Sequence, residues 1–128
     1  MSRILLDTHT FLWLSDAPER LPKRVRTLVA DPKSERFVSI ATLWEIAIKK
    51  SLGKLHIRQS VATFVQTYSD VIVFLPISAS HLTVIESLPL YHRDPFDRII
   101  IAQAMTENIS TLSVDVAFDA YNIERIWA

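Results

Sequence analysis

The sequence contains no cysteine, and this absence excludes several classes of protein. Disulfide frameworks and thiolate metal centres cannot form, so a metal ion would have to be bound through oxygen or imidazole ligands. A chain without cysteine also fits a reducing compartment, and we expect a cytoplasmic protein.

Long hydrophobic runs are missing as well. Hydrophobic residues make up 49% of the chain and the mean hydropathy is +0.21, yet no apolar run reaches the roughly 18 residues of a membrane span, so no membrane association is predicted. The apolar stretch near the N-terminus is too short for a signal peptide and ends in Asp7. The apolar excess in so small a chain predicts that another chain covers part of its surface.

No excess of one charge is present, because 14 basic residues balance 14 acidic ones. This balance argues against a strongly basic protein that coats nucleic acid non-specifically, but it allows a local basic patch beside an acidic site. The 128 residues predict a single domain, 1–128. A chain of this length buries about two thirds of its unfolded surface, so it needs no disulfide or metal to fold.

Short apolar runs alternate with helical patterns along the chain. Strands are predicted over 3–6, 36–40, 71–75, 110–114 and 123–127, and helices over 8–14, 22–30, 42–52, 60–69, 78–88, 95–108 and 116–121. The only glycine, Gly53, is predicted to end the third helix. Several strands are continuously apolar, which is typical of a sheet covered on both faces. The alternation predicts an α/β domain with a mainly parallel sheet, in which ligands bind beyond the carboxyl ends of the strands.

Four acidic residues are candidates for a site at that edge of the sheet. Asp7 and Asp115 directly follow predicted strands, Glu45 lies five residues beyond one, and Asp97 opens a predicted helix. The carboxyl ends of parallel strands share one edge, so we expect these acids to converge. Carboxylates that meet repel one another unless a cation lies between them. Oxygen ligands without thiolates favour Mg²⁺, and Mn²⁺ can substitute for it.

Each acid also has a purely structural interpretation. Asp7 and Asp115 can cap the helices that follow them. Glu45 matches a capping box with Thr42, and Trp44 before it is predicted to lie in the core. Asp97 falls in the first turn of its helix, where the helix dipole stabilises a negative charge. Capping explains each residue alone, but it does not explain why acids recur beyond the strands.

Four stretches of the sequence, taken in order, resemble the PIN-domain family. They are Asp7-Thr8-His9-Thr10-Phe11-Leu12-Trp13, Trp44-Glu45-Ile46-Ala47-Ile48-Lys49, His92-Arg93-Asp94-Pro95-Phe96-Asp97-Arg98 and Ser113-Val114-Asp115. More narrowly, they resemble the VapC-type toxins of bacterial toxin–antitoxin pairs. The match runs over nearly the whole chain, and its third stretch is specific.

The resemblance implies a three-layer α/β/α fold with a five-stranded, mainly parallel sheet. It also implies Mg²⁺-dependent cleavage of RNA, inhibition by a cognate VapB-type antitoxin, and a homodimer, in line with the apolar excess. The residues that match the family's four acids are Asp7, Glu45, Asp97 and Asp115, and Asp94 matches an extra acid of this subgroup. Many relatives carry an arginine where this chain has Val114, so the resemblance leaves the preferred RNA undefined.

Carboxylates that hold Mg²⁺ would polarise a phosphodiester for attack by water, whether one ion binds or two. We expect Asp7 and Asp97 to be the main ligands, Asp115 to complete the cluster, and Glu45 to orient the water or bind a second ion. Further residues are predicted to hold the ligands in place or to contact the substrate: Thr8, Asp94 and Ser113 in the first role, His92 and Arg98 in the second.

Other classes of protein fit less well. A receiver-like signalling domain would have paired acids after its first strand and a late lysine. A phosphatase of the haloacid-dehalogenase type would have Asp-x-Asp where this chain has His9 in third place. The remaining alternative is a catalytically silent PIN fold that binds RNA or protein, and the presence of all four acids argues against it.

Overall fold

The computed structural model describes residues 2–128, and its centre is a five-stranded sheet. The strands are β1 (Arg3–Leu6), β2 (Glu35–Ser39), β3 (Val73–Leu75), β4 (Ser110–Leu112) and β5 (Arg125–Ile126). They lie in the order β3-β2-β1-β4-β5, and every neighbouring pair is parallel. The parallel sheet that the sequence predicts is therefore confirmed.

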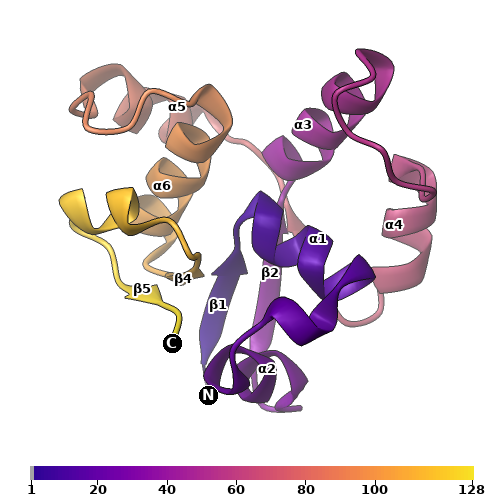
Figure 1. Cartoon of the computed structure of the whole chain (residues 1–128). Helices are drawn as coiled ribbons and strands as arrows, with labels where there is room; N and C mark the ends of the chain where they lie inside the picture. Colours follow the sequence, from indigo (N-terminus) through magenta and orange to yellow (C-terminus); the bar gives the residue numbers. More distant parts are fainter. Residues whose placement is uncertain (1) are drawn as a thin grey trace.

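Helices cover both faces of this sheet (Figure 1). They are α1 (Thr8–Asp16), α2 (Lys23–Ala30), α3 (Ile40–Ser51), α4 (Val61–Tyr68), α5 (Ala79–Ser87) and α6 (Pro95–Glu107), with 3₁₀ helices η1 (Pro18–Arg20) and η2 (Val116–Ala120). One core contains residues of α1 to α4, and a second contains residues of α6 and η2. This is the predicted three-layer α/β/α architecture. Among residues 2–128, no helix is long and apolar enough to cross a membrane.

The central strand β1 explains why an apolar run without alternation forms a strand here. Ile4 and Leu6 point into the first core, whereas Leu5 points into the second, and all three are fully buried. Successive side chains of a strand face opposite sides, so a strand between two helical layers has no polar face. Burying each of these side chains contributes about 1.5–3 kcal/mol.

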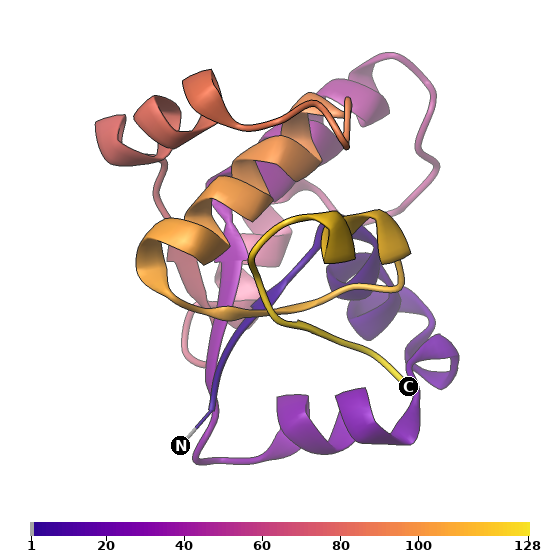
Figure 2. The ribbon, with the colours of Figure 1, turned by 90° about the vertical axis from the view of Figure 1, so that its left-hand side faces the viewer.

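The order of the strands places the candidate site between β1 and β4. From β1 the chain moves outward to β2 and β3, then crosses back to β4 and β5 on the other side of β1. In such sheets the crevice beyond the carboxyl ends lies where the strand order reverses. Asp7 follows β1 at this point, and Ser113 follows β4. The end of the molecule that carries α3 and α5 lies opposite to α2 (Figure 2).

The start of α3 differs from the prediction. Strand β2 leads directly into this helix, and Ser39 is its N-cap, with the hydroxyl accepting a hydrogen bond from the backbone N–H of Ala41. Thr42 therefore lies within the first turn, and the capping box predicted for Thr42 and Glu45 does not form. The core position predicted for Trp44 is also wrong, because its side chain is 52% exposed.

The end of α3 follows the prediction. Gly53 lies just beyond the helix with φ of 69°, in the left-handed region that favours glycine. Its N–H donates to the carbonyl of Lys50, and the N–H of Lys54 donates to that of Lys49. This pair of hydrogen bonds is the Schellman motif, which satisfies carbonyls that the helix leaves unpaired.

Candidate active site

The carboxylate of Asp7 lies at the end of β1 and is almost fully buried, with 3% of the residue exposed. It caps α1: Oδ1 accepts from the backbone N–H of Thr10 at 2.9 Å and from the Thr10 hydroxyl at 2.6 Å. Oδ2 accepts from the hydroxyl of Ser113 at 2.6 Å. Burial raises the pKa of Asp7, although these hydrogen bonds oppose the rise. Asp7 therefore caps α1 while it also lies beside the residues that follow β4, so the capping interpretation and the functional one do not exclude each other.

The carboxylates of Asp94 and Asp97 lie together at the start of α6. Asp94 is the N-cap and accepts from the backbone N–H of Asp97 at 2.9 Å. The pKa of Asp97 is raised to about 7, first by burial and then by the negative charges of Asp94, Asp7 and Glu45, while His92 opposes the rise. Burial and neighbouring negative charge both disfavour the ionised form of this carboxyl group, so a negative charge on Asp97 is costly in the metal-free protein.

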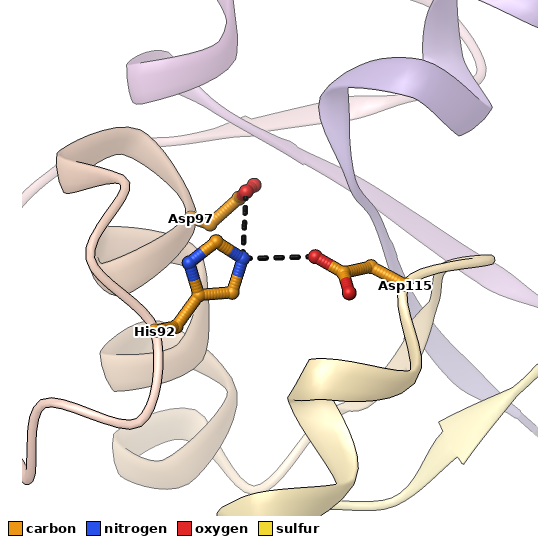
Figure 3. A group of neighbouring side chains, drawn as sticks. All are labelled: His92, Asp97 and Asp115. Carbon is orange, nitrogen blue, oxygen red and sulfur yellow. Dashed lines mark hydrogen bonds and ion pairs between the residues drawn. The ribbon is translucent and has the colours of Figure 1, made fainter.

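The fourth acid, Asp115, meets Asp97 through a histidine. Asp115 caps η2 by accepting from the backbone N–H of Ala117 at 2.9 Å. Nε2 of His92 lies 2.8 Å from Oδ2 of Asp115 and 3.1 Å from Oδ2 of Asp97 (Figure 3). One ligand atom from each of these three residues lies within 4.8 Å of the others, a spacing that could hold a metal ion.

Glu45 belongs to the same region but has partners of its own. It is buried, and it accepts hydrogen bonds from the Thr8 hydroxyl at 2.7 Å and from Nζ of Lys49 at 2.5 Å. The hydrogen bond to Glu45 raises the pKa of Lys49. A cavity of about 160 Å³ opens beside these residues, and its lining includes Thr8, Glu45, Lys49 and Lys54. Two lysines, one of them paired with Glu45, therefore line the cavity beside this acid.

The model of the PIN domain family matches residues 4–124. The chain belongs to the PIN-domain family. This PIN domain is similar in fold to a chain in the crystal structure of VapBC2 from Rickettsia felis bound to a DNA fragment from their promoter, with a TM-score of 0.73, 14% identity, and coverage of 98% of this chain and 99% of that one. No curated protein matches it in sequence.

Two further crystal structures have the same fold. A chain of VapBC-1 from nontypeable Haemophilus influenzae matches with a TM-score of 0.69 and 15% identity, over 97% of this chain and 96% of that one. A chain of DNA-bound VapBC from Salmonella typhimurium matches with a TM-score of 0.69 and 16% identity, over 98% of each chain. At these identities the likeness concerns the fold alone.

The PIN domain connects its predicted acids partly by direct contacts and partly through intervening residues. Asp97 and Asp115 meet directly at His92, whereas Asp7 joins them through Ser113, which also accepts from the backbone N–H of Asp115 at 3.0 Å. Glu45 lies beyond Thr8 and acts on Asp97 through its charge. Thr8, Asp94 and Ser113 each hydrogen-bond to a site acid or to its backbone.

Arg98, which the sequence predicts to contact the substrate, has several of its donors engaged within the chain. Its two terminal nitrogens donate to the backbone carbonyls of Ile85, Leu88, Pro89 and His92. These four bonds hold the guanidinium against the end of α5 and the loop before α6, and they support the backbone of His92; substrate contact by Arg98 stays a prediction. Thr10, which bonds to Asp7 through both its backbone N–H and its hydroxyl, is a site residue that is not among the predicted ones. A threonine three residues after an aspartate at a helix start has the spacing of a residue bonded to the N-cap.

The donor set fits a hard divalent cation. Among residues 2–128, the site offers carboxylate oxygens and one imidazole nitrogen, and the negative charges of Asp94, Asp7 and Glu45 around Asp97 favour a cation there. Oxygen-rich ligation of this kind is typical of Mg²⁺ and Mn²⁺. The PIN domain therefore has a candidate metal centre at the carboxyl edge of its sheet.

Proposed function

We propose that this PIN domain is a Mg²⁺-dependent endoribonuclease, with Mn²⁺ able to replace Mg²⁺, and that it is the toxin of a toxin–antitoxin pair. The observation that carries the proposal is the gathering of carboxylates at one edge of the sheet, where Asp97 and Asp115 meet at His92 and Ser113 links Asp7 to the backbone of Asp115. In the metal-free protein the carboxylates of such a cluster repel one another, and a bound cation would offset this repulsion. A divalent cation would supply charge compensation and polarisation of a phosphodiester oxygen.

Different residues of the site would bind the cation, orient its ligands and orient the attacking water. Asp7, Asp97 and Asp115 would hold the cation, since Asp97 and Asp115 share a contact with His92 and Ser113 bonds to both Asp7 and the backbone of Asp115. Ser113 would fix the orientation of Asp7, to which it donates at 2.6 Å. Glu45 would orient the attacking water, and its ion pair with Lys49 would hold its carboxylate in place. His92 would lie beside the phosphodiester, because its Nε2 contacts two of the three ligands.

The substrate class follows from the resemblance to VapC-type toxins together with the local charge. Lys49 and Lys54 line the cavity beside Glu45 and would attract a phosphate backbone. In-line attack by water on RNA leaves a 5′-phosphate and a 3′-hydroxyl. The purified protein should therefore cut a labelled RNA in Mg²⁺ and leave these ends, while a DNA of the same sequence stays intact. Binding of RNA without cleavage would favour the silent binding module instead.

We also propose a VapB-type antitoxin as partner, a homodimer and a cytoplasmic location. The structurally similar chains come from complexes of VapB with VapC. Large apolar side chains remain exposed on this chain: Trp44 at 52%, Leu90 at 69% and Val116 at 69%. Exposed apolar groups of this size favour a surface that a second chain covers. Light scattering at micromolar concentration should give the mass of a dimer, and a monomer would contradict this part of the proposal.

A further inference from the structure

The two ring nitrogens of His92 have different hydrogen-bonding partners. Nδ1 accepts a hydrogen bond from the backbone N–H of Asp94 at 3.2 Å. A ring nitrogen that accepts a hydrogen bond carries no proton, so the neutral ring must carry its proton on Nε2. This Nε2–H lies between the carboxylates of Asp97 and Asp115 and can donate to both (Figure 3).

We propose that His92 is a positioning residue, which holds the carboxylates of Asp97 and Asp115 at the spacing that the cation requires and is not itself a metal ligand. The inference rests on the proposed function, because it assumes that this site binds a cation. Two neighbouring carboxylates repel each other and would move apart in the metal-free protein. A shared N–H offsets this repulsion, so less free energy is needed to bring the ligands together when the cation binds.

The surroundings of His92 fit such a role because they fix it on several sides. Its backbone N–H donates to the hydroxyl of Tyr121 at 2.7 Å, and that hydroxyl donates to the carbonyl of Pro89 at 2.7 Å. Arg98 donates to the carbonyls of both Pro89 and His92. The imidazole meets the buried ring of Phe118 edge-on, with the ring centroids 5.9 Å apart. A donor fixed in this way loses little conformational freedom when the ligands assemble.

The same geometry opposes a role for His92 as a ligand. To bind a cation, Nε2 would have to lose its proton, and in a neutral ring that proton would move to Nδ1. Nδ1 would then face the N–H of Asp94, which would lose its acceptor. The hydrogen bond from Asp94 therefore selects the tautomer that donates toward the carboxylates.

The tautomer can be read directly by NMR. Long-range ¹H–¹⁵N correlation spectra of the ¹⁵N-labelled protein should show a protonated Nε2 and an unprotonated Nδ1 for His92 in the metal-free state. Addition of Mg²⁺ should leave this pattern unchanged. Loss of the proton from Nε2 on addition of Mg²⁺ would overturn the proposal, since it would make His92 a ligand.

Binding of Mn²⁺, measured by electron paramagnetic resonance, tests the positioning itself. His92→Leu keeps an apolar contact for Phe118 but removes the donor, and it should weaken Mn²⁺ binding by about 10-fold or more. His92→Gln places an N–H₂ near the position of Nε2 and should restore most of the affinity. His56→Leu, at an exposed position outside the site, should bind like the wild type, and thermal melting should show that all three variants fold.

The outcomes separate this inference from the proposed function. If the wild type binds Mn²⁺ and His92→Leu binds it as tightly or more tightly, the inference fails while the proposed metal site stands. If the wild type binds neither Mn²⁺ nor Mg²⁺, the proposed function fails and the inference fails with it. If His92→Leu is folded and weakened but His92→Gln is not improved, the donor is not what matters, and the positioning role is overturned.

Discussion

The hydroxyl of Ser113 donates to Oδ2 of Asp7 at 2.6 Å and thereby joins the end of β4 to the end of β1. The hydroxyl oxygen of Ser113 also accepts from the backbone N–H of Asp115 at 3.0 Å. Ser113 is fully buried, so water does not compete for either of these hydrogen bonds. One hydroxyl thus sets the distance between two acids that lie more than a hundred residues apart in the chain.

We expect Ser113→Ala to lower both the stability and the metal affinity of the protein. Loss of a hydrogen bond to a buried, charged carboxylate costs about 1.5–3 kcal/mol. The bond from Ser113 lowers the pKa of Asp7, so its loss should raise that pKa further and favour the protonated form, which binds cations poorly. Urea denaturation measures the first effect and titration with Mn²⁺ the second.

The matched control for this variant is Ser60→Ala. Ser60 caps α4 at an exposed position, so its loss should cost about 1 kcal/mol and leave Mn²⁺ binding unchanged. Equal metal affinity in Ser113→Ala and the wild type would show that the hydroxyl is only a structural link.

Glu45→Gln should separate the charge of Glu45 from its shape. Gln can still accept from Thr8, but it loses the ion pair with Lys49 and removes one of the charges that raise the pKa of Asp97. These two effects oppose each other, so metal-free stability should change by less than about 1 kcal/mol. The thermal shift caused by Mg²⁺ should shrink, and RNA cleavage should be largely lost. A full Mg²⁺ shift with full activity would limit the site to three aspartates.

The pH dependence of stability should follow Asp97. The pKa of this carboxyl is raised from 3.8 to about 7 in the folded protein, so between these values the folded state holds a proton that the unfolded state has released. The contribution of Asp97 to stability is therefore fully present below the unfolded pKa of 3.8 and is lost as the pH rises from there through the folded pKa of about 7. Metal-free protein should lose more stability between about pH 4 and about pH 7 than Asp97→Asn does.

Mg²⁺ should reverse this trend, because the cation competes with the proton at Asp97. Mg²⁺ binding should weaken as the pH falls below the pKa of about 7, and calorimetry in buffers of different ionisation enthalpy should record proton release. The same pH dependence of melting in Asp97→Asn and the wild type would show that another group is responsible.

The sequence predicts most of the fold because the hydrophobic pattern of each strand follows from the faces that the strand buries. The continuous run Ile4–Leu6 requires cover on both faces, and the structure supplies it with two cores. The order of the strands also predicts which residues meet beyond them. Asp7 and Ser113 follow adjacent parallel strands, so topology alone places them side by side.

The remaining features depend on contacts that no periodic pattern encodes. Serine and threonine both cap helices, so either Ser39 or Thr42 could begin α3. Because β2 ends at Ser39 and the helix follows at once, Ser39 is the N-cap. Trp44 lies on an apolar helix, but its side chain meets Phe96 edge-on at the surface rather than entering the core. Arg98 donates to four backbone carbonyls between Ile85 and His92, and no motif in the sequence predicts these bonds.

The most direct test of the central claim is cleavage of one labelled RNA by the wild type and by Asp7→Asn, each in Mg²⁺ and in EDTA. Asn can still accept from the backbone N–H of Thr10, so the variant should keep its fold, which circular dichroism checks. The wild type should cut in Mg²⁺, stop in EDTA and resume when Mg²⁺ is restored, while folded Asp7→Asn stays inactive throughout. Undiminished cleavage in EDTA, or wild-type cleavage by Asp7→Asn, would contradict a carboxylate-held metal as the centre of the reaction.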